Sequence, residues 1–355
     1  MKQRVAILCG GRSSEHEISC ISAGGVLQAM DKDLYEPIAI GITKSGSWVL
    51  IPTSFDFTIK DGALPVVPEN APKVTIDVAG LSVDGKSLNI DIVFPLLHGP
   101  YGEDGTIQGL LEIIDLPYVG SGVLASAVAM DKSFAKPIFQ SQGMKVAPGI
   151  TATAAQWSHD PDAVQREADL LGYPVFVKPA RGGSSRGTTK VKKASDLRAA
   201  IIESHLFDPK VMIEQEIQGM EIECAVLEVD GTPRASIVGK ISFDAKYEFY
   251  DFEAKYLDNT TTIELPAPIS DGDSEAIRKS AVDAFIALGC SGLARGDFFL
   301  TKNGEVIINE INTMPGFTAT SVFPKMWQAS GIGYQEVITH LLKSALTRSN
   351  GVLGN

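Results

Sequence analysis

The sequence predicts an α/β protein of several domains, with a parallel sheet near its N-terminus and an antiparallel hairpin near its C-terminus. Residues 4–9 form a short, almost wholly apolar run, which is typical of a strand buried in a parallel sheet. Two glycines and a helical segment follow, an order typical of an α/β nucleotide or anion site. Residues 293–300 and 306–312 are strand-like runs joined by a turn with Asn-Gly, a strong hairpin signal.

The remaining elements are predicted from apolar runs of helical or strand period between glycine, proline and Asp-Gly breakers. The N-terminal group comprises a helix up to residue 30, strands at 35–42 and 89–95, and a helix at 106–114. The middle group comprises helices at 123–130, 133–142 and 196–204, with strands at 173–179, 190–192 and 211–217. The last group comprises strands at 221–229 and 237–241, a helix at 271–288, the hairpin, and helices between 323 and 346. We therefore divide the chain into residues 1–121, 122–217 and 218–355.

One stretch shows neither the helical nor the strand period of apolar residues. Residues 243–257 are rich in aromatic and charged side chains, and a long connection of this kind in a compact domain is typical of a lid or binding loop. We predict a lid loop at residues 242–260 and a frayed tail at 351–355.

The composition limits the class of protein. With 44% hydrophobic and 21% charged residues, a packed globular protein is expected. The net charge of -12 argues against a nucleic acid partner, which requires a basic surface. The four cysteines have no metal-ligand spacing, and no apolar run reaches the ~18 residues of a membrane helix. We therefore expect a cytoplasmic protein without a membrane partner.

The C-terminal hairpin carries a candidate metal site. Glu310 and Asn312 are two residues apart and share one face of their strand, and Asp297 lies on the partner strand. Two carboxylates and an amide oxygen suit Mg²⁺, which also binds substrate phosphates. Arg295 shares the face of Asp297 and fits a phosphate or carboxylate. The alternative interpretation is an ordinary hairpin with solvated acids.

Three further segments carry candidate site residues. Glu15 lies near a helix start and His98 in a glycine-rich loop, while Lys178 precedes a loop at 181–187 with three glycines, two serines and two arginines. Free N–H groups and guanidinium groups are typical of a loop that covers phosphates. The alternatives are a first-turn acid, a plain loop histidine and a solvated hairpin turn.

With these segments in order, the chain resembles the D-alanine–D-alanine ligases of the ATP-grasp superfamily along essentially its whole length. The resemblance rests on six motifs: Gly10-Gly-Arg-Ser-Ser-Glu-His-Glu17, His98-Gly-Pro-Tyr-Gly-Glu-Asp-Gly105, Val177-Lys-Pro179 with Gly183-Ser-Ser185, Glu253-Ala-Lys-Tyr256, Ala294-Arg-Gly-Asp297 and Asn309-Glu-Ile-Asn-Thr-Met-Pro-Gly316. It implies a three-domain ATP-grasp fold with a Rossmann-like N-terminal domain. The implied reaction is ATP-dependent: one D-alanine is phosphorylated on its carboxylate, and the amine of a second D-alanine displaces the phosphate. The dipeptide serves peptidoglycan synthesis, and hence the cell wall and cell shape.

The resemblance also implies roles for individual residues. Those implied to bind ATP are Lys132, Lys178, Ser185, Glu214, Gln215, Ile217 and Glu221. Those implied to bind substrate or assist the chemistry are Glu15, His98, Ser184, Lys255, Tyr256, Arg295, Gly316 and Ser321. Asp297, Glu310 and Asn312 are implied to hold two Mg²⁺ ions, for which Mn²⁺ may substitute, and the family implies a homodimer.

Two rival functions differ in chemistry. A D-alanine–D-lactate ligase, or another carboxylate–amine ligase, would share the fold, and a catalytically silent nucleotide-binding regulator would have lost metal ligands or lid residues. The departures here are small: Gln215 stands where many relatives carry lysine, and Met314 where several carry leucine or serine.

The lid supplies a first prediction. Tyr256→Phe removes one hydroxyl hydrogen bond, typically ~1 kcal/mol net, while the ring still packs. We expect modestly less dipeptide and more ester from D-lactate, most clearly below about pH 7, where the competing amine is more fully protonated. Both products are measured against pH in wild type and variant, and an unchanged ester-to-dipeptide ratio would remove Tyr256 from substrate selection.

Overall fold

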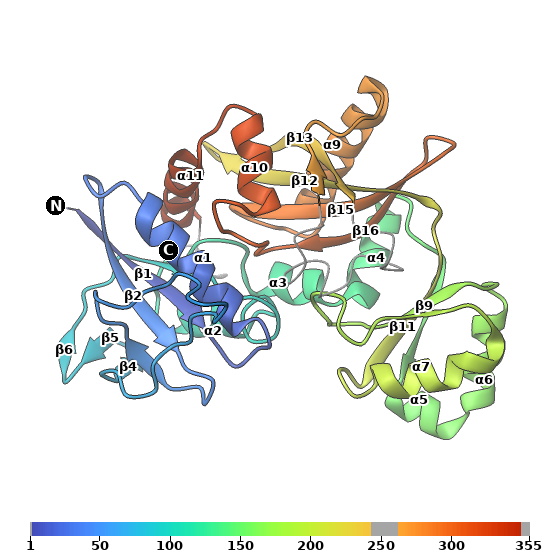
Figure 1. Ribbon diagram of the computed structural model, residues 1–355, viewed down its shortest axis with the longest axis horizontal. Coiled ribbons are helices and arrows are strands. Elements are labelled where there is room, and N and C mark those ends of the chain that lie inside the picture. Colours follow the sequence, from blue (N-terminus) through green and yellow to red (C-terminus); the bar gives the residue numbers. More distant parts are fainter. Residues whose placement is uncertain (1, 243–261, 349–355) are drawn as a thin grey trace.

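The structure is a computed structural model that describes residues 2–242 and 262–348 of the 355-residue chain. The predicted lid at 242–260, with Lys255 and Tyr256, and the tail at 351–355 therefore lie outside the described residues, apart from Ser242. The described residues form four sheets with helices around them (Figure 1).

The first sheet has the strand order β3-β2-β1-β7. Its strands are β1 (Gln3–Gly10), β2 (Tyr35–Ile42), β3 (Trp48–Leu50) and β7 (Ile92–Pro95). β1 is parallel to both β2 and β7, and α1 (His16–Ala29) follows it, which confirms the predicted strand, turn and helix. The strand predicted from residue 89 begins later, because Asn89 has a left-handed backbone with φ of 46°.

The position of β1 determines where the first sheet can bind a ligand. The chain passes from β1 to β2 on one side, and β7 lies on the other side, so this is the point where the strand order reverses. The loops that follow β1 and β7 separate there and leave a crevice at the carboxyl ends of the strands. These two loops carry Glu15 and His98.

A small antiparallel sheet was not predicted from the sequence. Its strands are β4 (Val74–Asp77), β5 (Gly80–Val83) and β6 (Lys86–Ser87), and α2 (Thr106–Ile113) comes after β7. The strands are only two to four residues long, so they present too few apolar positions for a periodic signal.

The middle sheet is antiparallel, with the order β10-β9-β11-β8. Its strands are β8 (Gly149–Thr153), β9 (Val175–Pro179), β10 (Thr189–Val191) and β11 (Lys210–Gln215). Helices α5 (Ala154–His159), α6 (Pro161–Asp169) and α7 (Leu197–Ser204) and the 3-10 turn η1 (Ala194–Asp196) accompany it. Ala152, Val177 and Ile201 belong to its own small core. β8, α5 and α6 were missed from the sequence, because this stretch has few apolar residues.

The last sheet has the order β14-β13-β12-β15-β16. Its strands are β12 (Gly219–Val229), β13 (Thr232–Ser242), β14 (Thr262–Glu264), β15 (Leu293–Thr301) and β16 (Val306–Asn312). The helices around it are α3 (Val123–Met130), α4 (Lys132–Ser141), α9 (Asp271–Ala287), α10 (Val322–Ala329) and α11 (Tyr334–Thr347). The predicted hairpin is confirmed as β15 and β16, paired antiparallel.

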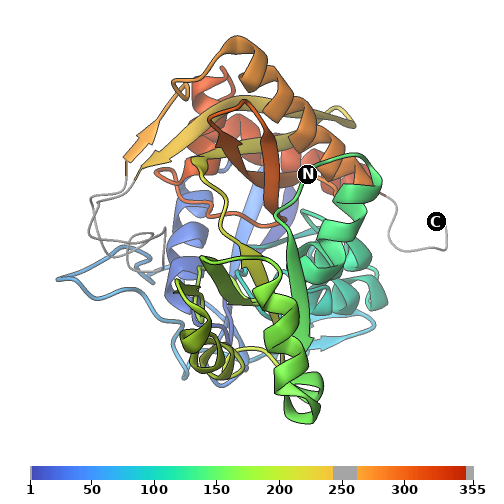
Figure 2. The same cartoon turned by 90° about the vertical axis from the view of Figure 1, so that its right-hand side faces the viewer.

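Two cores join segments that are distant in the sequence. α3 and α4 contribute Ala125 and Phe139 to the core of the last sheet, so residues 122–217 are divided between two cores. α11 contributes Leu341 to the core that contains Ile7 and Phe94 of the first sheet. Figures 1 and 2 show the resulting arrangement, in which the last sheet lies beside both the first sheet and the middle sheet. The loops of the first sheet are thereby held close to β15 and β16.

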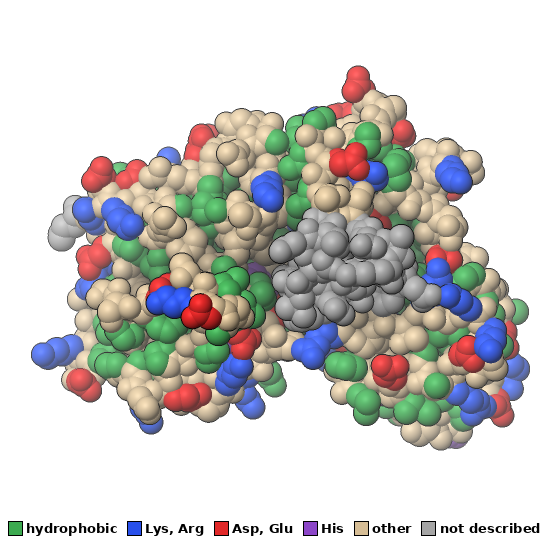
Figure 3. All heavy atoms as spheres, viewed as in Figure 1, with side chains coloured by type: hydrophobic (Ala, Val, Ile, Leu, Met, Phe, Trp, Pro, Cys, Tyr) green, Lys and Arg blue, Asp and Glu red, His purple; other side chains and the backbone are tan. Residues whose placement is uncertain are grey.

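The surface is mixed in charge. On the face seen in Figure 3, basic side chains lie between acidic ones and do not form one continuous patch. This face therefore differs from the basic surface typical of nucleic-acid-binding proteins. Within residues 2–242 and 262–348, no helix has the length and apolar composition that a membrane span requires.

Candidate functional site

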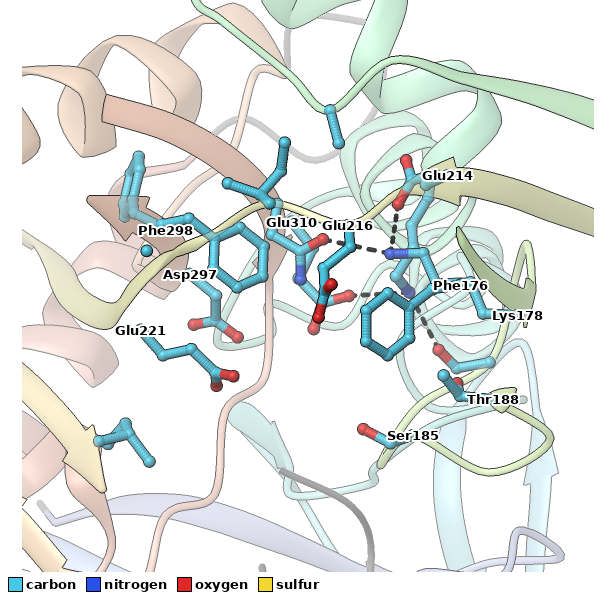
Figure 4. A pocket seen from close by; sticks show the side chains of 18 of the residues that line it. Phe176, Lys178, Ser185, Thr188, Glu214, Glu216, Glu221, Asp297, Phe298 and Glu310 are labelled. Atoms are coloured by element: carbon cyan, nitrogen blue, oxygen red, sulfur yellow. Dashed lines mark hydrogen bonds and ion pairs between the residues drawn. The ribbon is translucent and has the colours of Figure 1, made fainter. Parts of the chain in front are cut away.

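A cavity of about 290 Å³ lies between the middle sheet and the last sheet. Lys178 of β9 and Glu214 of β11 face it from one side, and Asp297 of β15 and Glu310 of β16 from the other (Figure 4). Predicted ATP-binding residues in its lining are Lys132, Lys178, Ser185, Glu214, Gln215, Ile217 and Glu221. The structure thus brings together side chains that are spread over the sequence from residue 132 to residue 310.

The predicted metal ligands meet on the hairpin. Asp297 and Glu310 are directly opposite in the register of β15 and β16, and the amide of Asn312 donates to Asp297 Oδ2 at 3.1 Å. Two carboxylates and the amide of Asn312 thus lie together on the hairpin, and carboxylate and amide side chains are a ligand set that fits Mg²⁺. Among the described residues, no cluster of three or more His, Cys, Asp and Glu side chains is arranged for a metal; the third predicted ligand here is an amide.

Each of these acids has a cationic partner. Lys132 Nζ lies 2.9 Å from Glu310 Oε2, and Arg295 Nε lies 2.7 Å from Asp297 Oδ1 and 3.2 Å from Glu223 Oε2. Burial alone would lower the pKa of Arg295, but the carboxylates of Asp297 and Glu223 raise it well above its usual value. The negative charges of Asp297 and Glu310 are therefore each neutralised by a neighbouring cation.

A second charge cluster surrounds Glu214. Its carboxylate is 3% exposed and pairs with Lys136 and with Lys178, the latter at 2.6 Å. Burial would raise the pKa of Glu214, but Lys136 and Lys178 outweigh it and lower this pKa to about 2. Burial lowers the pKa of Lys136 to about 8. Lys136 was missed from the sequence, although its place four residues after Lys132 on a helix puts both on one face.

The residues of the predicted adenine segment differ in orientation. Ile217 lines the cavity, and so does Phe176, which was not predicted. The side-chain amide of Gln215 donates to the carbonyl of Leu171 at 3.1 Å, and its backbone N–H donates to the carbonyl of Pro148 at 2.9 Å. Glu221 faces the cavity from β12 (Figure 4).

Glu15 and Ser184, two candidate substrate residues, join the first sheet to the glycine-rich loop. Glu15 is buried, and Ser184 Oγ donates to its Oε1 at 2.5 Å. A Cβ atom on Gly99 would come within 2.8 Å of Glu15 Oε2, so this position leaves no room for a side chain. Ser184 and Glu15, both implied by the resemblance to bind substrate or assist the chemistry, are thus in direct contact.

The loop arginines are not equivalent. Arg186 lines the cavity, whereas Arg181 lies outside the lining and binds Asp208 through two hydrogen bonds of its guanidinium group. The interpretation of both guanidinium groups as phosphate ligands is therefore wrong for Arg181. Asp208 was missed, since nothing in the sequence marks the partner of a loop arginine.

His98 and Glu103 hold one residue of the loop after β16. His98 Nδ1 lies 3.0 Å from the carbonyl oxygen of Met314, and the N–H of Met314 donates to Glu103 Oε1 at 3.1 Å. The other Glu103 oxygen accepts from the N–H of Gly99 at 2.7 Å. Burial lowers the pKa of His98, which favours the neutral ring that a donor Nδ1 and an acceptor Nε2 require. Glu103 was missed, although it lies within the glycine-rich motif.

The same loop carries the last predicted residues. Gly316 follows Met314 by two positions, and Ser321 precedes α10. Ser321 Oγ accepts from the N–H of Thr318 at 3.1 Å and lies 2.8 Å from Thr318 Oγ1. Contacts at Met314 and between Thr318 and Ser321 therefore hold this loop at two places between β16 and α10.

Comparisons with known proteins agree over the whole chain. The family model described as "D-ala D-ala ligase N-terminus" matches residues 4–121, and "D-ala D-ala ligase C-terminus" matches residues 138–343. A D-alanine–D-alanine ligase of Pseudarthrobacter chlorophenolicus is 51% identical, with 99% of this chain and 96% of that protein covered. One from Streptomyces avermitilis is 47% identical, with 99% and 96% covered.

Solved structures give the same result. The D-alanine–D-alanine ligase from Coxiella burnetii superposes with a TM-score of 0.81 at 37% identity, covering 97% of this chain and 95% of that chain. The VanG D-Ala:D-Ser ligase from Enterococcus faecalis superposes with a TM-score of 0.84 at 33% identity, covering 97% and 100%.

Glu103 supplies a prediction on stability. Burial, and then the charge of Glu15, raise its pKa from 4.5 to about 8. The folded protein thus holds this proton more tightly than the unfolded chain, and the resulting stability is present below pH 4.5 and is lost as the pH rises to about 8. We expect Glu103→Gln to flatten the decline of the unfolding free energy in this window, measured by urea unfolding. Glu305→Gln, at an exposed acid, is the control, and equal slopes for both variants and wild type would contradict the assignment.

Proposed function

The chain belongs to the D-alanine–D-alanine ligase family, which joins two D-alanine molecules with ATP for peptidoglycan synthesis, and from this premise we propose how its residues carry out the reaction. The ATP-grasp fold predicted from the sequence is the fold of this family and is confirmed. One observation carries the residue assignment: a cavity with lysines on one wall and oxygen ligands on the other opens beside the Glu15–Ser184 contact.

The cavity is the proposed ATP site. Lys132 and Lys178 are placed to bind phosphates, and Ser185 belongs to the loop that covers them. The backbone near Gln215 and the side chain of Ile217 are assigned to the adenine ring, with Glu221 assigned to the ribose. Glu214 acts through Lys178: the salt bridge between them orients the ammonium group toward the cavity.

Asp297, Glu310 and Asn312 are proposed to hold Mg²⁺, as two ions in this family, with Mn²⁺ as a substitute. Bound metal would neutralise the charge of the phosphates. The donor set fits this group because the Asp297 and Glu310 carboxylates lie opposite each other across the hairpin and the amide of Asn312 contacts Asp297. Lys132 and Arg295 pair with these carboxylates here, so both cations lie close enough to serve the phosphates once the acids have other partners.

The amino-acid substrates are assigned to the crevice between the first sheet and the hairpin. Glu15 binds the ammonium group of the first D-alanine, with His98 beside it, and the carboxylate of that molecule attacks the terminal phosphate of ATP. The amine of the second D-alanine then attacks the acyl phosphate. Arg295 and the N–H of Gly316 stabilise the oxyanion that forms, and Ser321 receives the carboxylate of the second substrate.

The lid residues Lys255 and Tyr256 are assigned by the resemblance alone, because both lie outside the described residues. A closed lid would exclude water from the acyl phosphate, with Lys255 reaching the terminal phosphate and Tyr256 joining Ser184 and Glu15. Three domains at 1–121, 122–217 and 218–355, a homodimer and a cytoplasmic location complete the proposal.

One prediction concerns ATP affinity. Lys178→Met removes a charge-assisted hydrogen bond to a phosphate, which corresponds to a rise of about 10- to 100-fold in the KM for ATP. The KM values for D-alanine should change much less. A coupled assay of ADP release measures all of them, and Lys193→Met, an exposed lysine of the same unit, is the control. An unchanged KM for ATP together with unchanged turnover would refute the phosphate assignment.

A further prediction concerns the metal. Asp297→Asn and Glu310→Gln each remove one charge from the proposed site. We therefore expect a higher Mg²⁺ requirement and a fall in turnover of about 100-fold or more. Turnover is measured against Mg²⁺ concentration, and metal binding by calorimetry. Asp283→Asn, at an exposed helix position, is the matched control. Wild-type turnover at low Mg²⁺ in both variants would be incompatible with these ligands.

A further inference from the structure

The loop between β9 and β10 has an unusual backbone. Ser184 and Ser185 are consecutive left-handed residues, with φ of 50° and 57°. Residues other than glycine rarely adopt this conformation, and it persists only where the surrounding structure holds it. The conformation lets Ser184 donate to Glu15 while Ser185 lines the cavity. The question is what holds the two serines.

Asp208 holds the N-terminal end of this loop. Its Oδ2 accepts from the backbone N–H of Arg181 at 2.9 Å and from Arg181 Nε at 3.1 Å, and its Oδ1 accepts from Arg181 Nη2 at 2.7 Å. Oδ1 also accepts from the backbone N–H of Lys210 at 3.0 Å. The carboxylate is 4% exposed, so four N–H groups fix a buried acid between the loop and the start of β11.

Phe207 holds the other end. Gly187 has φ of +71°, and a Cβ atom there would come within 2.5 Å of Cδ2 of the Phe207 ring, so the ring lies directly against the loop backbone. Phe207 and Asp208 are adjacent in sequence. The two ends of the loop, six residues apart from Arg181 to Gly187, are thus held by one dipeptide.

Lys210, whose N–H is bound by Asp208, is linked in turn to Lys132. The N–H of Ala180 donates to the carbonyl of Lys210, and the N–H of Lys132 donates to the carbonyl of Ala180, at 2.9 and 3.1 Å. Lys210 Nζ also pairs with Asp131, which precedes Lys132 at the start of α4. A substitution at Asp208 is therefore expected to alter the contacts among the loop, β11 and α4.

We propose that Phe207 and Asp208 are positioning residues that hold the glycine-rich loop in the conformation that binds ATP and the first D-alanine. The inference rests on the proposed assignment of this loop to the nucleotide. Without these contacts the two serines relax to ordinary backbone angles, and only a fraction of molecules has a competent loop. The apparent affinity falls by that fraction, whereas saturating ATP restores the competent state.

Steady-state kinetics test the proposal in Asp208→Asn, Arg181→Met and the double variant. We expect the KM for ATP to rise about 10-fold and turnover at saturation to fall less than about 3-fold. The KM for the first D-alanine should rise as well, because Ser184 lies on the same loop, and the KM for the second should not. The double variant should be no worse than either single variant, since both remove one contact. Arg198→Met breaks an exposed ion pair of the same unit and is the control.

Limited proteolysis measures the loop directly, without nucleotide. Arg186 lies within the loop, and we expect trypsin to cleave after it several-fold faster in Asp208→Asn and Phe207→Ala than in wild type or Arg198→Met. Arg181→Met serves if Asp208→Asn does not fold, because the Arg181 side chain is half exposed.

The possible outcomes distinguish the proposed positioning role of Phe207 and Asp208 from the proposed ATP site. Suppose that Asp208→Asn, Arg181→Met and Phe207→Ala are cleaved at the wild-type rate and keep the wild-type KM for ATP, while Lys178→Met raises this KM. This result would overturn the positioning role of Phe207 and Asp208 and leave the ATP site intact. Faster cleavage with an unchanged KM for ATP would also overturn the proposal, because the loop would then be held without serving the nucleotide. Parallel losses of thermal stability, turnover and both D-alanine affinities would show a purely structural role. An unchanged KM for ATP in Lys178→Met as well would overturn both assignments.

Discussion

The site depends on one constraint: charges that are removed from water between two sheets must be paired. An isolated buried ion carries a desolvation cost of several kcal/mol, so a buried lysine or carboxylate is stable only beside an opposite charge. Glu214 satisfies this rule with Lys136 and Lys178, and Glu310 with Lys132. The pairs join different elements, so they also fix how the middle sheet and α4 lie against the hairpin.

The same constraint explains why the groups of the proposed ATP site are arranged as neutralised pairs. A phosphate can replace Glu310 as the partner of Lys132, and a cation can replace Lys132 as the partner of Glu310. Each exchange keeps the number of buried opposite charges balanced, so neither group passes through an unpaired state. Asp297 and Arg295 repeat the arrangement beside it. Under the proposed assignment, a nucleotide with its metal is therefore a better electrostatic match to this cavity than either component alone.

The sequence allowed the prediction of features that depend on local pattern. The period of two along β16 correctly placed Glu310 and Asn312 on one face, and the Asn-Gly turn correctly paired their strand with that of Asp297. It did not allow the prediction of features that arise from tertiary contacts. Glu103 and Asp208 accept hydrogen bonds from distant backbone groups, which no local pattern encodes. The packing of α3 and α4 on the last sheet was missed for the same reason, since periodicity identifies an apolar face and not its partner.

The proposed substrate crevice is assembled from segments that no single element supplies. Ser184 and Glu15 are 169 residues apart along the chain, and His98 and Met314 are 216 apart. Contacts across such separations form only when the sheets have packed. The crevice is therefore completed by the packing of the first, middle and last sheets. Each of these contacts joins two loops, and the loops of Glu15 and His98 adjoin α1 and β7, which lie in the same core as α11. The loops are therefore free to vary in conformation only as far as these few hydrogen bonds allow. That is why the strained pair at Ser184 and Ser185 is held from two directions: by Glu15 on the substrate side and by the Phe207–Asp208 dipeptide on the side away from it.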